Sequence, residues 1–246
     1  MCTLTYRLTA QGYQVFFNRD EQRTRPQAIQ PQFDPILHSV YPVDPTGGGT
    51  WIAVHETGVT LALLNYYQAQ VDPSLKTFIS RGVIIPHLLA DIDNVHQQLL
   101  DMDLTQFQAF QLCVFDKSLS KNTVESAFAQ QYIWDGKSLT FSTLSIETSL
   151  PITSSSVDYD LVYAARKGKF QSMIEQSQST TSDYINYHQE QGEIGKCSVR
   201  MFREDAKTVS FTQISVNQTL EIGSKVQVNY IDYLLPERQQ TFSINL

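Results

Sequence analysis

The segment Met1–Glu21 reads MCTLTYRLTAQGYQVFFNRDE and decides the fold prediction. Two runs rich in β-branched and aromatic residues, Cys2–Leu8 and Tyr13–Phe17, flank the turn signal Gln11-Gly12, which is typical of a β-hairpin. An antiparallel hairpin returns the end of its second strand to the start of its first. We therefore expect Asn18-Arg19-Asp20-Glu21 to lie beside the start of the chain.

Cys2 is the candidate nucleophile. Removal of Met1 would leave a thiol and a free α-amine on one residue, and an α-amine with a pKa of about 7.7–8.0 can act as a base for its own side chain. Arg19 would lower the pKa of the thiol, and Asp20 would hold the amine by a charge-assisted hydrogen bond. Neighbours in a strand point to opposite faces, so both reach Cys2 only if the chain turns there. The alternative is an ordinary small residue at position 2 and a solvated, charged turn.

The rest of the chain alternates blocks of strands and helices. Strands are predicted at Thr50–Val54, Val59–Asn65, Phe107–Asp116, Gln131–Trp134, Lys137–Ser142, Cys197–Phe202, Thr208–Val216, Lys225–Tyr233 and Gln239–Ile244. Helices are predicted within Arg81–Asp101, over Asp158–Gln176, and from an N-cap at Ser182 through Gln189, while Thr123–Gln130 fits a short helix or a strand extension. Asn18–Pro45 holds five of the nine prolines and is predicted as a long loop. This order predicts one α+β layered domain over residues 1–246.

Composition excludes several classes of partner. A formal charge of -7 argues against nucleic acid or an anionic membrane, because phosphate binding needs an excess of Lys and Arg. No stretch approaches the roughly 18 apolar residues of a membrane span, and Met1–Ala10 lacks the apolar run of a signal peptide. Three irregularly spaced cysteines fit a reducing compartment. A cytoplasmic location is therefore expected.

Other candidate motifs are less specific. The five histidines show no metal-ligand spacing, so no metal site is expected. Gly47-Gly48-Gly49 is followed by a strand and not by Lys-Ser/Thr, so it is interpreted as a close backbone approach beside a site and not as a phosphate loop. Trp51 and Tyr66-Tyr67 either line a substrate cleft or pack in the core.

Five motifs in order carry a resemblance to a known family. They are Met1-Cys2-Thr3, Asn18-Arg19-Asp20-Glu21, Gly48-Gly49-Thr50-Trp51 followed by Gly58, Asn65-Tyr66, and Ser80-Arg81-Gly82. The chain resembles the Asn-Arg-Asp-Glu family, also called the transport and Golgi organisation protein 2 family. That family is similar in turn to the N-terminal-nucleophile amidases, among them penicillin V acylase and bile salt hydrolase. The resemblance implies an αββα sandwich, in which two antiparallel sheets lie between helix layers.

The resemblance also implies hydrolysis of a linear, non-peptide amide C–N bond, with no cofactor required. It implies Cys2 as nucleophile, Arg19 as thiol partner, Asp20 as amine anchor and the backbone N–H of Asn65 as oxyanion donor, with Asn18, Ser154 and Arg200 in support and Trp51, Tyr66 and Arg81 in the substrate cleft. In the amidases two residues separate the Arg from the Asp, whereas Arg19 and Asp20 are adjacent. Ser154 would replace an amidase Asn as second oxyanion donor.

A non-enzymatic ligand carrier is the alternative. Eukaryotic relatives in this family are associated with secretory organisation, lipid handling and haem trafficking, which implies a haem or lipid-like ligand in the same cleft. Cys2, His55 and His188 are then the candidate haem ligands. A third alternative is a degenerate member of the fold that acts through partners.

Overall fold

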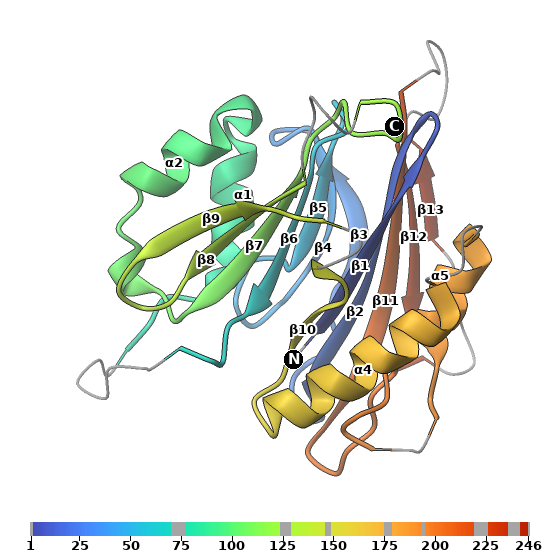
Figure 1. Ribbon diagram of the computed structural model, residues 1–246. Coiled ribbons are helices and arrows are strands. Elements are labelled where there is room, and N and C mark those ends of the chain that lie inside the picture. The colour runs from blue at the N-terminus through green and yellow to red at the C-terminus, as the bar shows by residue number, and fades with distance from the viewer. Residues whose placement is uncertain are drawn as a thin grey trace.

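Two antiparallel sheets pack face to face between helices in the computed structural model, which describes residues 2–69, 77–123, 129–145, 149–174, 179–192, 195–218, 226–235 and 242–245 (Figure 1). Sheet A has the strand order β10-β1-β2-β11-β12-β13, and sheet B has the order β3-β4-β5-β6-β7-β8-β9. Helices α4 and α5 pack on sheet A, and α1 packs on sheet B. The αββα sandwich is therefore confirmed, while a single domain over residues 1–246 stays a prediction.

Sheet A contains the predicted N-terminal hairpin. Its strands are β1 (Cys2–Thr9), β2 (Gly12–Gln22), β10 (Ile152–Ser154), β11 (Ala206–Asn217), β12 (Val226–Asp232) and β13 (Phe242–Asn245). The hairpin register runs from Thr9 opposite Gly12 to Cys2 opposite Arg19. On its other side β1 pairs with the short strand β10, which sets Ser154 opposite Cys2. The first residues of the described chain are thus held between two neighbouring strands.

Sheet B corrects one prediction. Its strands are β3 (Ile29–Asp34), β4 (Ser39–Val43), β5 (Ile52–His55), β6 (Thr60–Asn65), β7 (Phe110–Phe115), β8 (Ala129–Trp134) and β9 (Leu139–Thr143). The long loop predicted over Asn18–Pro45 is wrong, because β2 continues to Gln22 and a second hairpin, β3–β4, follows. Proline is tolerated in this hairpin because Pro31 lies in an edge strand at an irregularity of its register, and Pro42 lies beyond the two residues of β4 that pair with β5.

The helices on sheet B are short and interrupted. The segment predicted as helical within Arg81–Asp101 contains the 3-10 turn η1 (Arg81–Val83), α1 (Ile84–Leu89), the 3-10 turn η2 (Ile92–Asn94) and α2 (Val95–Asp101), and a third turn, η3 (Leu104–Gln106), follows. A second core of buried apolar side chains joins these helices to sheet B, with Ile84, Ile85 and Leu88 fully buried.

The helices on sheet A are α4 (Tyr159–Ile174) and α5 (Thr181–Gln189). The N-cap of α5 is Thr180 and not Ser182, because Thr180 forms a capping box with Asp183. The strand predicted at Cys197–Phe202 is wrong: its residues up to Arg200 form turns and bends, and Phe202 makes only an isolated bridge with Lys207. The Arg200 N–H donates to the Glu190 carbonyl at the end of α5. Residues 124–128, 175–176, 225 and 239–241 of the predicted elements lie outside the described residues.

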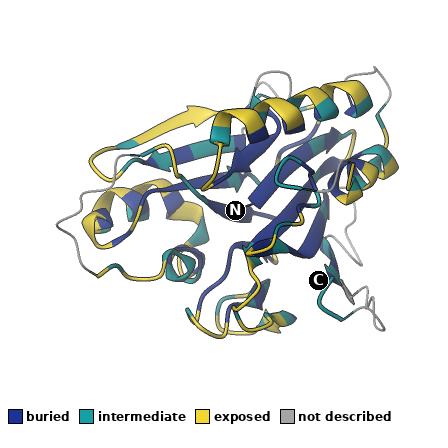
Figure 2. Cartoon of the chain, turned by 90° about the horizontal axis from the view of Figure 1, so that it is seen from below, coloured by how far each residue is buried: buried dark blue, intermediate teal, exposed yellow. Residues whose placement is uncertain are grey.

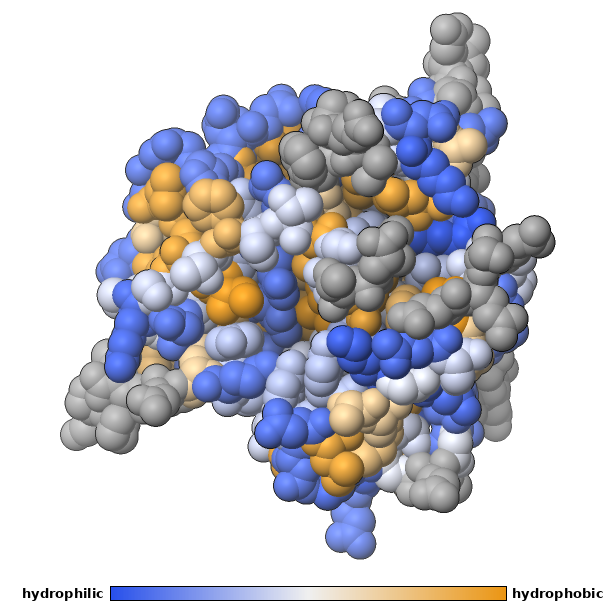
Figure 3. Space-filling model, in the orientation of Figure 1, coloured by the Kyte–Doolittle hydropathy of each residue, from blue (hydrophilic) through white to orange (hydrophobic). Residues whose placement is uncertain are grey.

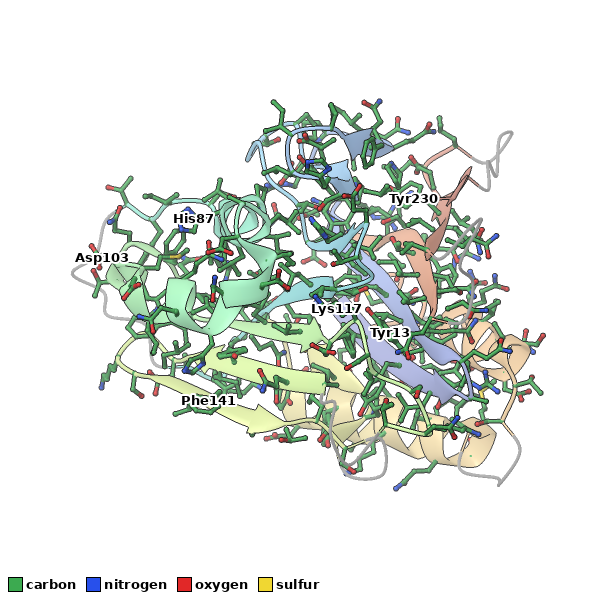
Figure 4. The ribbon with its side chains drawn as sticks, turned by 90° about the horizontal axis from the view of Figure 1, so that it is seen from above. Tyr13, His87, Asp103, Lys117, Phe141 and Tyr230 are labelled. Carbon is green, nitrogen blue, oxygen red and sulfur yellow. The ribbon has the colours of Figure 1, made fainter. Side chains whose placement is uncertain are left out.

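The main core lies between the two sheets. Figure 2 shows the buried strands enclosed by helices whose outer faces are exposed. Tyr13, labelled in Figure 4, joins the sheets, since its hydroxyl donates to the Gly58 carbonyl at 2.7 Å and its ring stacks on Phe115. On the face seen in Figure 3, hydrophobic and hydrophilic residues are interspersed. None of the described helices is long and apolar enough to cross a membrane.

Candidate active site

A cleft of about 660 Å³ opens beside the start of β1. Its described lining comes from the ends of β1, β2 and β6, the loop between β4 and β5, and the segment that leads into η1. The lining residues used below are Cys2, Arg19, Asp20, Glu21, Arg25, Asp44, Trp51, Asn65, Tyr67 and Arg81. Most of these side chains are polar or charged, so the cleft suits a ligand with polar groups.

Cys2 lies at the floor of this cleft. It is 8% exposed and stands opposite Arg19 on β2 and Ser154 on β10. Cross-strand partners share a face of the sheet, so the three residues form a row on the face of sheet A that is turned towards sheet B. The hairpin argument from sequence therefore placed Arg19 correctly beside Cys2.

The Asn18–Glu21 motif is divided between the two faces of sheet A. The chain does not turn at Arg19, because β2 continues to Gln22. Arg19 and Glu21 consequently point to the inner face, and the Arg19 guanidinium donates to Glu21 Oε2 at 3.0 Å. Asp20 borders the cleft, but its carboxylate accepts a 2.6 Å hydrogen bond from Thr208 and lies 3.4 Å from the Arg166 guanidinium of α4.

Arg19 belongs to a network of four charged residues, the others being Glu21, Arg25 and Asp44. Its guanidinium lies 3.7 Å from Asp44 and 4.2 Å from the centre of the Trp51 ring, a cation–π contact. Arg25 binds the same two carboxylates, since it donates to Asp44 and its Nε lies 3.6 Å from Glu21 Oε2. Two guanidinium groups and two carboxylates therefore compensate one another along one wall of the cleft.

The outer face of the same strands is closed by α4 and α5. Arg166, only 1% exposed, donates to the Thr3 hydroxyl at 2.5 Å in addition to its ion pair with Asp20. Asn18 donates to the backbone carbonyls of His188 and Val199. Asn18 therefore has a structural position and lies outside the described cleft lining.

Arg166 is the supporting residue that the sequence did not assign. The signal was present, because Val162, Arg166 and Phe170 follow one another at a spacing of four on the buried face of α4. A charged residue within an apolar stripe is almost never fully buried unless it is paired. Such a position predicts that the charge has a buried partner but does not say which residue it is. In the structure the partner is Asp20.

Burial raises the pKa of the Cys2 thiol above its ordinary value. The positive charge of the N-terminus, the Asp20 backbone N–H and the Arg19 charge lower it, whereas the Asp20 carboxylate raises it further. In the chain that still carries Met1, the surroundings of Cys2 therefore favour the neutral thiol over the thiolate.

The predicted cleft residues are brought together with one exception. Asn65, Trp51 and Arg81 line the cleft, and Asn65 donates to the Tyr67 hydroxyl at 2.7 Å. Tyr67, and not Tyr66, belongs to the described lining; both residues follow the end of β6 at Asn65, and Tyr67 lies in a turn. Trp51 serves both predicted roles, since it is 6% exposed and also belongs to the core between the sheets.

Ser154 and Arg200 occupy different positions. Ser154 is fully buried next to Cys2, and its hydroxyl has no hydrogen-bond partner among the described residues. Arg200 lies outside the described cleft lining, where its guanidinium packs over the Tyr233 ring at 3.8 Å. The sequence match that suggested a site role for Arg200 therefore identified a residue that packs against the ring of Tyr233.

Two of the three candidate haem ligands lie away from the described cleft lining. His55 bonds to the Thr57 hydroxyl at 2.9 Å at the end of β5. His188 is fully buried on the outer face of sheet A, where its ring bonds to the Thr5 hydroxyl and burial lowers its pKa to about 3. Among the candidates, Cys2 alone borders the cleft.

Comparison with known proteins follows from this fold and site. The family model for Transport and Golgi organisation 2 matches residues 1–231. This chain belongs to the Transport and Golgi organisation 2 family. A human relative, Transport and Golgi organization protein 2 homolog, is 30% identical over 112 residues, a match that covers 44% of this chain and 40% of the human protein.

Solved structures similar to this family member share its fold. Penicillin V acylase from Agrobacterium tumefaciens superposes with a TM-score of 0.54 at 11% identity, covering 100% of this chain and 86% of the other. The N-acylethanolamine-hydrolyzing acid amidase orthologue from Caenorhabditis elegans gives 0.54 at 10% identity, with both chains fully covered. A mutant of conjugated bile acid hydrolase from Clostridium perfringens gives 0.53 at 11%, covering 100% and 92%. The chain therefore has the N-terminal-nucleophile hydrolase fold.

Proposed function

We propose that this chain is an N-terminal-nucleophile cysteine amidohydrolase that cleaves a linear, non-peptide amide C–N bond. The observation that carries the proposal is Cys2 beside Arg19 at a polar cleft, with the buried Ser154 opposite Cys2 on β10. It is supported by a fold shared with amidases whose names include an acylase and an acylethanolamine hydrolase. Fold alone does not fix function, so the residues of the site decide it.

The reaction needs the α-amine that removal of Met1 would free. The amine takes the thiol proton, and the Cys2 sulfur attacks the amide carbon, whose C=O electrons move onto oxygen. The developing negative charge would be stabilised by the Asn65 backbone N–H, and the Ser154 hydroxyl is the second candidate donor. The C–N bond then breaks as the ammonium returns its proton to the leaving nitrogen, which leaves a thioester on Cys2. A water molecule, deprotonated by the amine, attacks the thioester and releases the acid and the thiol.

Arg19 and Asp20 have separate tasks in this proposal. Arg19 faces the thiol side of the strand and would stabilise the thiolate, with Glu21, Asp44 and Trp51 fixing its guanidinium. Asp20, held by Thr208 and Arg166, would anchor the amine through its position at the edge of the cleft. Loss of Met1 would also bring solvent and an ammonium group to Cys2, and both favour the thiolate that burial now disfavours.

The test compares two forms of the same chain. One is produced without an N-terminal tag, so that Met1 can be removed during synthesis and Cys2 becomes the first residue, and the other keeps an N-terminal extension. We expect iodoacetamide at neutral pH to alkylate Cys2 of the first form far faster than Cys113 and Cys197, as followed by intact mass. We also expect only this form to hydrolyse acyl-amides, and Cys2→Ser to lose at least about 1,000-fold in kcat/KM. Equal, slow alkylation of Cys2 in both forms would contradict the proposal.

A non-enzymatic carrier of haem or a lipid-like ligand is the second candidate. The observation that favours it is the raised pKa of the Cys2 thiol, which leaves the unprocessed chain without an activated nucleophile. If the chain is a carrier, haem should bind both N-terminal forms with equal affinity and give a Soret band in both. If Cys2 supplies the ligand, Cys2→Ala shifts that band. A band that requires the free α-amine would argue against the carrier.

A further inference from the structure

Three arginines line the described part of the cleft, and two of them are electrically compensated. Arg19 and Arg25 share the carboxylates of Glu21 and Asp44, all within ion-pair distance. The remaining carboxylate at the cleft, Asp20, is paired with Arg166 from behind the sheet. The acidic groups of the described lining are therefore already occupied by other cations.

Arg81 is the uncompensated cation of this lining. One of its terminal nitrogens donates to the Ala109 carbonyl at 2.8 Å, and no carboxylate of the described residues lies within ion-pair distance of it. The side chain is half-buried, and burial lowers its pKa, whereas the charges of Tyr67, Cys2 and Glu21 raise it. A guanidinium has five N–H donors, so most of its hydrogen-bonding capacity is open to a ligand.

The backbone around Arg81 is fixed by contact with the glycine run. A Cβ placed on Gly49 would lie 2.1 Å from the backbone carbon of Gly82, and the Thr50 N–H donates to the Gly82 carbonyl at 2.9 Å. The Ser80 hydroxyl accepts from the Gly82 N–H and caps η1. Two glycine-containing motifs far apart in the sequence thus hold Arg81 at the cleft, and a positioned guanidinium loses little entropy on binding.

We propose that Arg81 binds a carboxylate of the substrate, so that the preferred substrates are amides that also bear a carboxylate. This inference rests on the proposed hydrolase function and names its substrate class. A carboxylate matches the planar fork of a guanidinium, which can bind both oxygens at once. Arg81 then holds the charged end of the amide while Cys2 attacks its carbonyl.

The experiment measures kcat/KM for matched pairs of amides. The first pair is an N-acylglycine and the N-acylethanolamine with the same acyl chain, and the second is a glutaryl amide and the corresponding pentanoyl amide. In the wild type we expect the carboxylated member of at least one pair to be preferred by about 10- to 100-fold. In Arg81→Gln the ratio falls to near one, and in Arg81→Lys part of it remains.

The ratio within a pair separates recognition from general damage. A change in folding or in the thiol pKa alters both members of a pair alike and leaves their ratio unchanged. Arg23→Gln, which removes an arginine outside the cleft lining, is the matched control and should keep the wild-type ratio. A wild-type ratio near one in both pairs, or a ratio that survives Arg81→Gln, would overturn the proposal while leaving the hydrolase function intact.

Failure of the hydrolase function has a different signature, namely no turnover of any amide. Binding can then be read without catalysis, from the rate at which iodoacetamide alkylates Cys2 in the presence of each compound. Protection by the carboxylated member alone, lost in Arg81→Gln, would support the carboxylate site. Equal protection by both members of each pair would overturn it.

Discussion

The two faces of the β1–β2 hairpin use neighbouring residues for different purposes. On the inner face, Cys2 and Arg19 border a cleft, and the Arg19 charge is balanced by groups that also line that cleft. On the outer face, the side chains of Asp20 and of Arg166, which belongs to α4, have no exposed area. The inner face keeps its polar groups within reach of a ligand, whereas on the outer face Asp20 and Arg166 are shielded from solvent and Asp20 meets the cleft only at its edge.

This difference shows why consecutive residues of a short motif need not share one environment. In an extended strand, alternate residues of Asn18–Glu21 enter different environments, and a charge in each environment has a different energetic consequence. A buried ion pair loses several kcal/mol when one partner is removed, because the other charge stays buried, whereas a partly exposed pair loses little. The following variants test this comparison.

Arg166→Met should have the largest effect on stability. It leaves the Asp20 carboxylate buried without its ion-pair partner, so we expect a loss of about 3–5 kcal/mol in the free energy of unfolding measured with urea. On the inner face, Glu21→Gln should cost no more than about 1 kcal/mol, because the Glu21 side chain is 23% exposed. The double variant Asp20→Asn with Arg166→Met should recover part of the loss. Equal losses for Arg166→Met and Glu21→Gln would show that the two faces do not differ.

Gly49→Ala should have the next largest effect, because its new Cβ has no room against the backbone of Gly82. Overpacking of this kind costs about 1–3 kcal/mol, and here it also displaces η1 and Arg81. Gly168→Ala in α4 is the matched control, since nothing lies within 4 Å of its Cβ position. It should be neutral or stabilising by up to about 1 kcal/mol. Calorimetry measures the thermal stability of both variants. Equal stability of Gly49→Ala and Gly168→Ala would contradict the close contact between Gly49 and the Gly82 backbone.

Acid should destabilise the outer face through His188. Burial lowers its pKa to about 3, so the unfolded chain, with an ordinary His pKa of about 6.5, binds the proton more readily. This contribution is fully present above about pH 6.5 and is lost as the pH falls towards the folded-state value. Between pH 7 and pH 5 the loss is about 2 kcal/mol, and His188→Gln should remove it. Identical pH profiles for the variant and the wild type would mean that His188 does not titrate in this way.

Trp51→Phe should have the smallest effect. The cation–π contact with Arg19 weakens by no more than about 1 kcal/mol, and the indole N–H has no hydrogen-bond partner among the described residues to lose. The free energy of unfolding and the rate of Cys2 alkylation should both change little. A loss of more than about 2 kcal/mol would mean that the shape of the indole ring, and not its cation–π contact, holds this wall of the cleft.

Local sequence patterns predicted the first and the Asp135-Gly136 hairpins and the helical segments. They failed where contacts between distant segments determine the local structure. The Gln11-Gly12 and Asp135-Gly136 turns placed their flanking strands, and the juxtaposition of Cys2 with Arg19 followed from the first of them. The β3–β4 hairpin was missed because proline content indicates a loop when the edge position of a strand is unknown. Cys197–Phe202 has strand-like residues, but its backbone bonds to the end of α5 instead.

The site was predictable in part for the same reason. Residues joined by a hairpin or carried by an ordered motif, such as Arg19, Asn65 and Arg81, do line the cleft. Arg166 was not assigned because its partner on β2 is 146 positions away, and no local pattern reports where a helix docks. Tyr66 and Tyr67 lie past the end of β6, where the alternation of a strand no longer indicates which neighbour faces the cleft.

The pairing of β1 on both sides has a consequence for the timing of maturation. In the folded protein Cys2 is 8% exposed and is held in ladders with β2 and β10. An aminopeptidase must draw an extended, accessible chain end into its own cleft. If Cys2 is to gain a free amine, its processing therefore belongs to the nascent chain, before residues around position 153 have been synthesised and have completed the sheet.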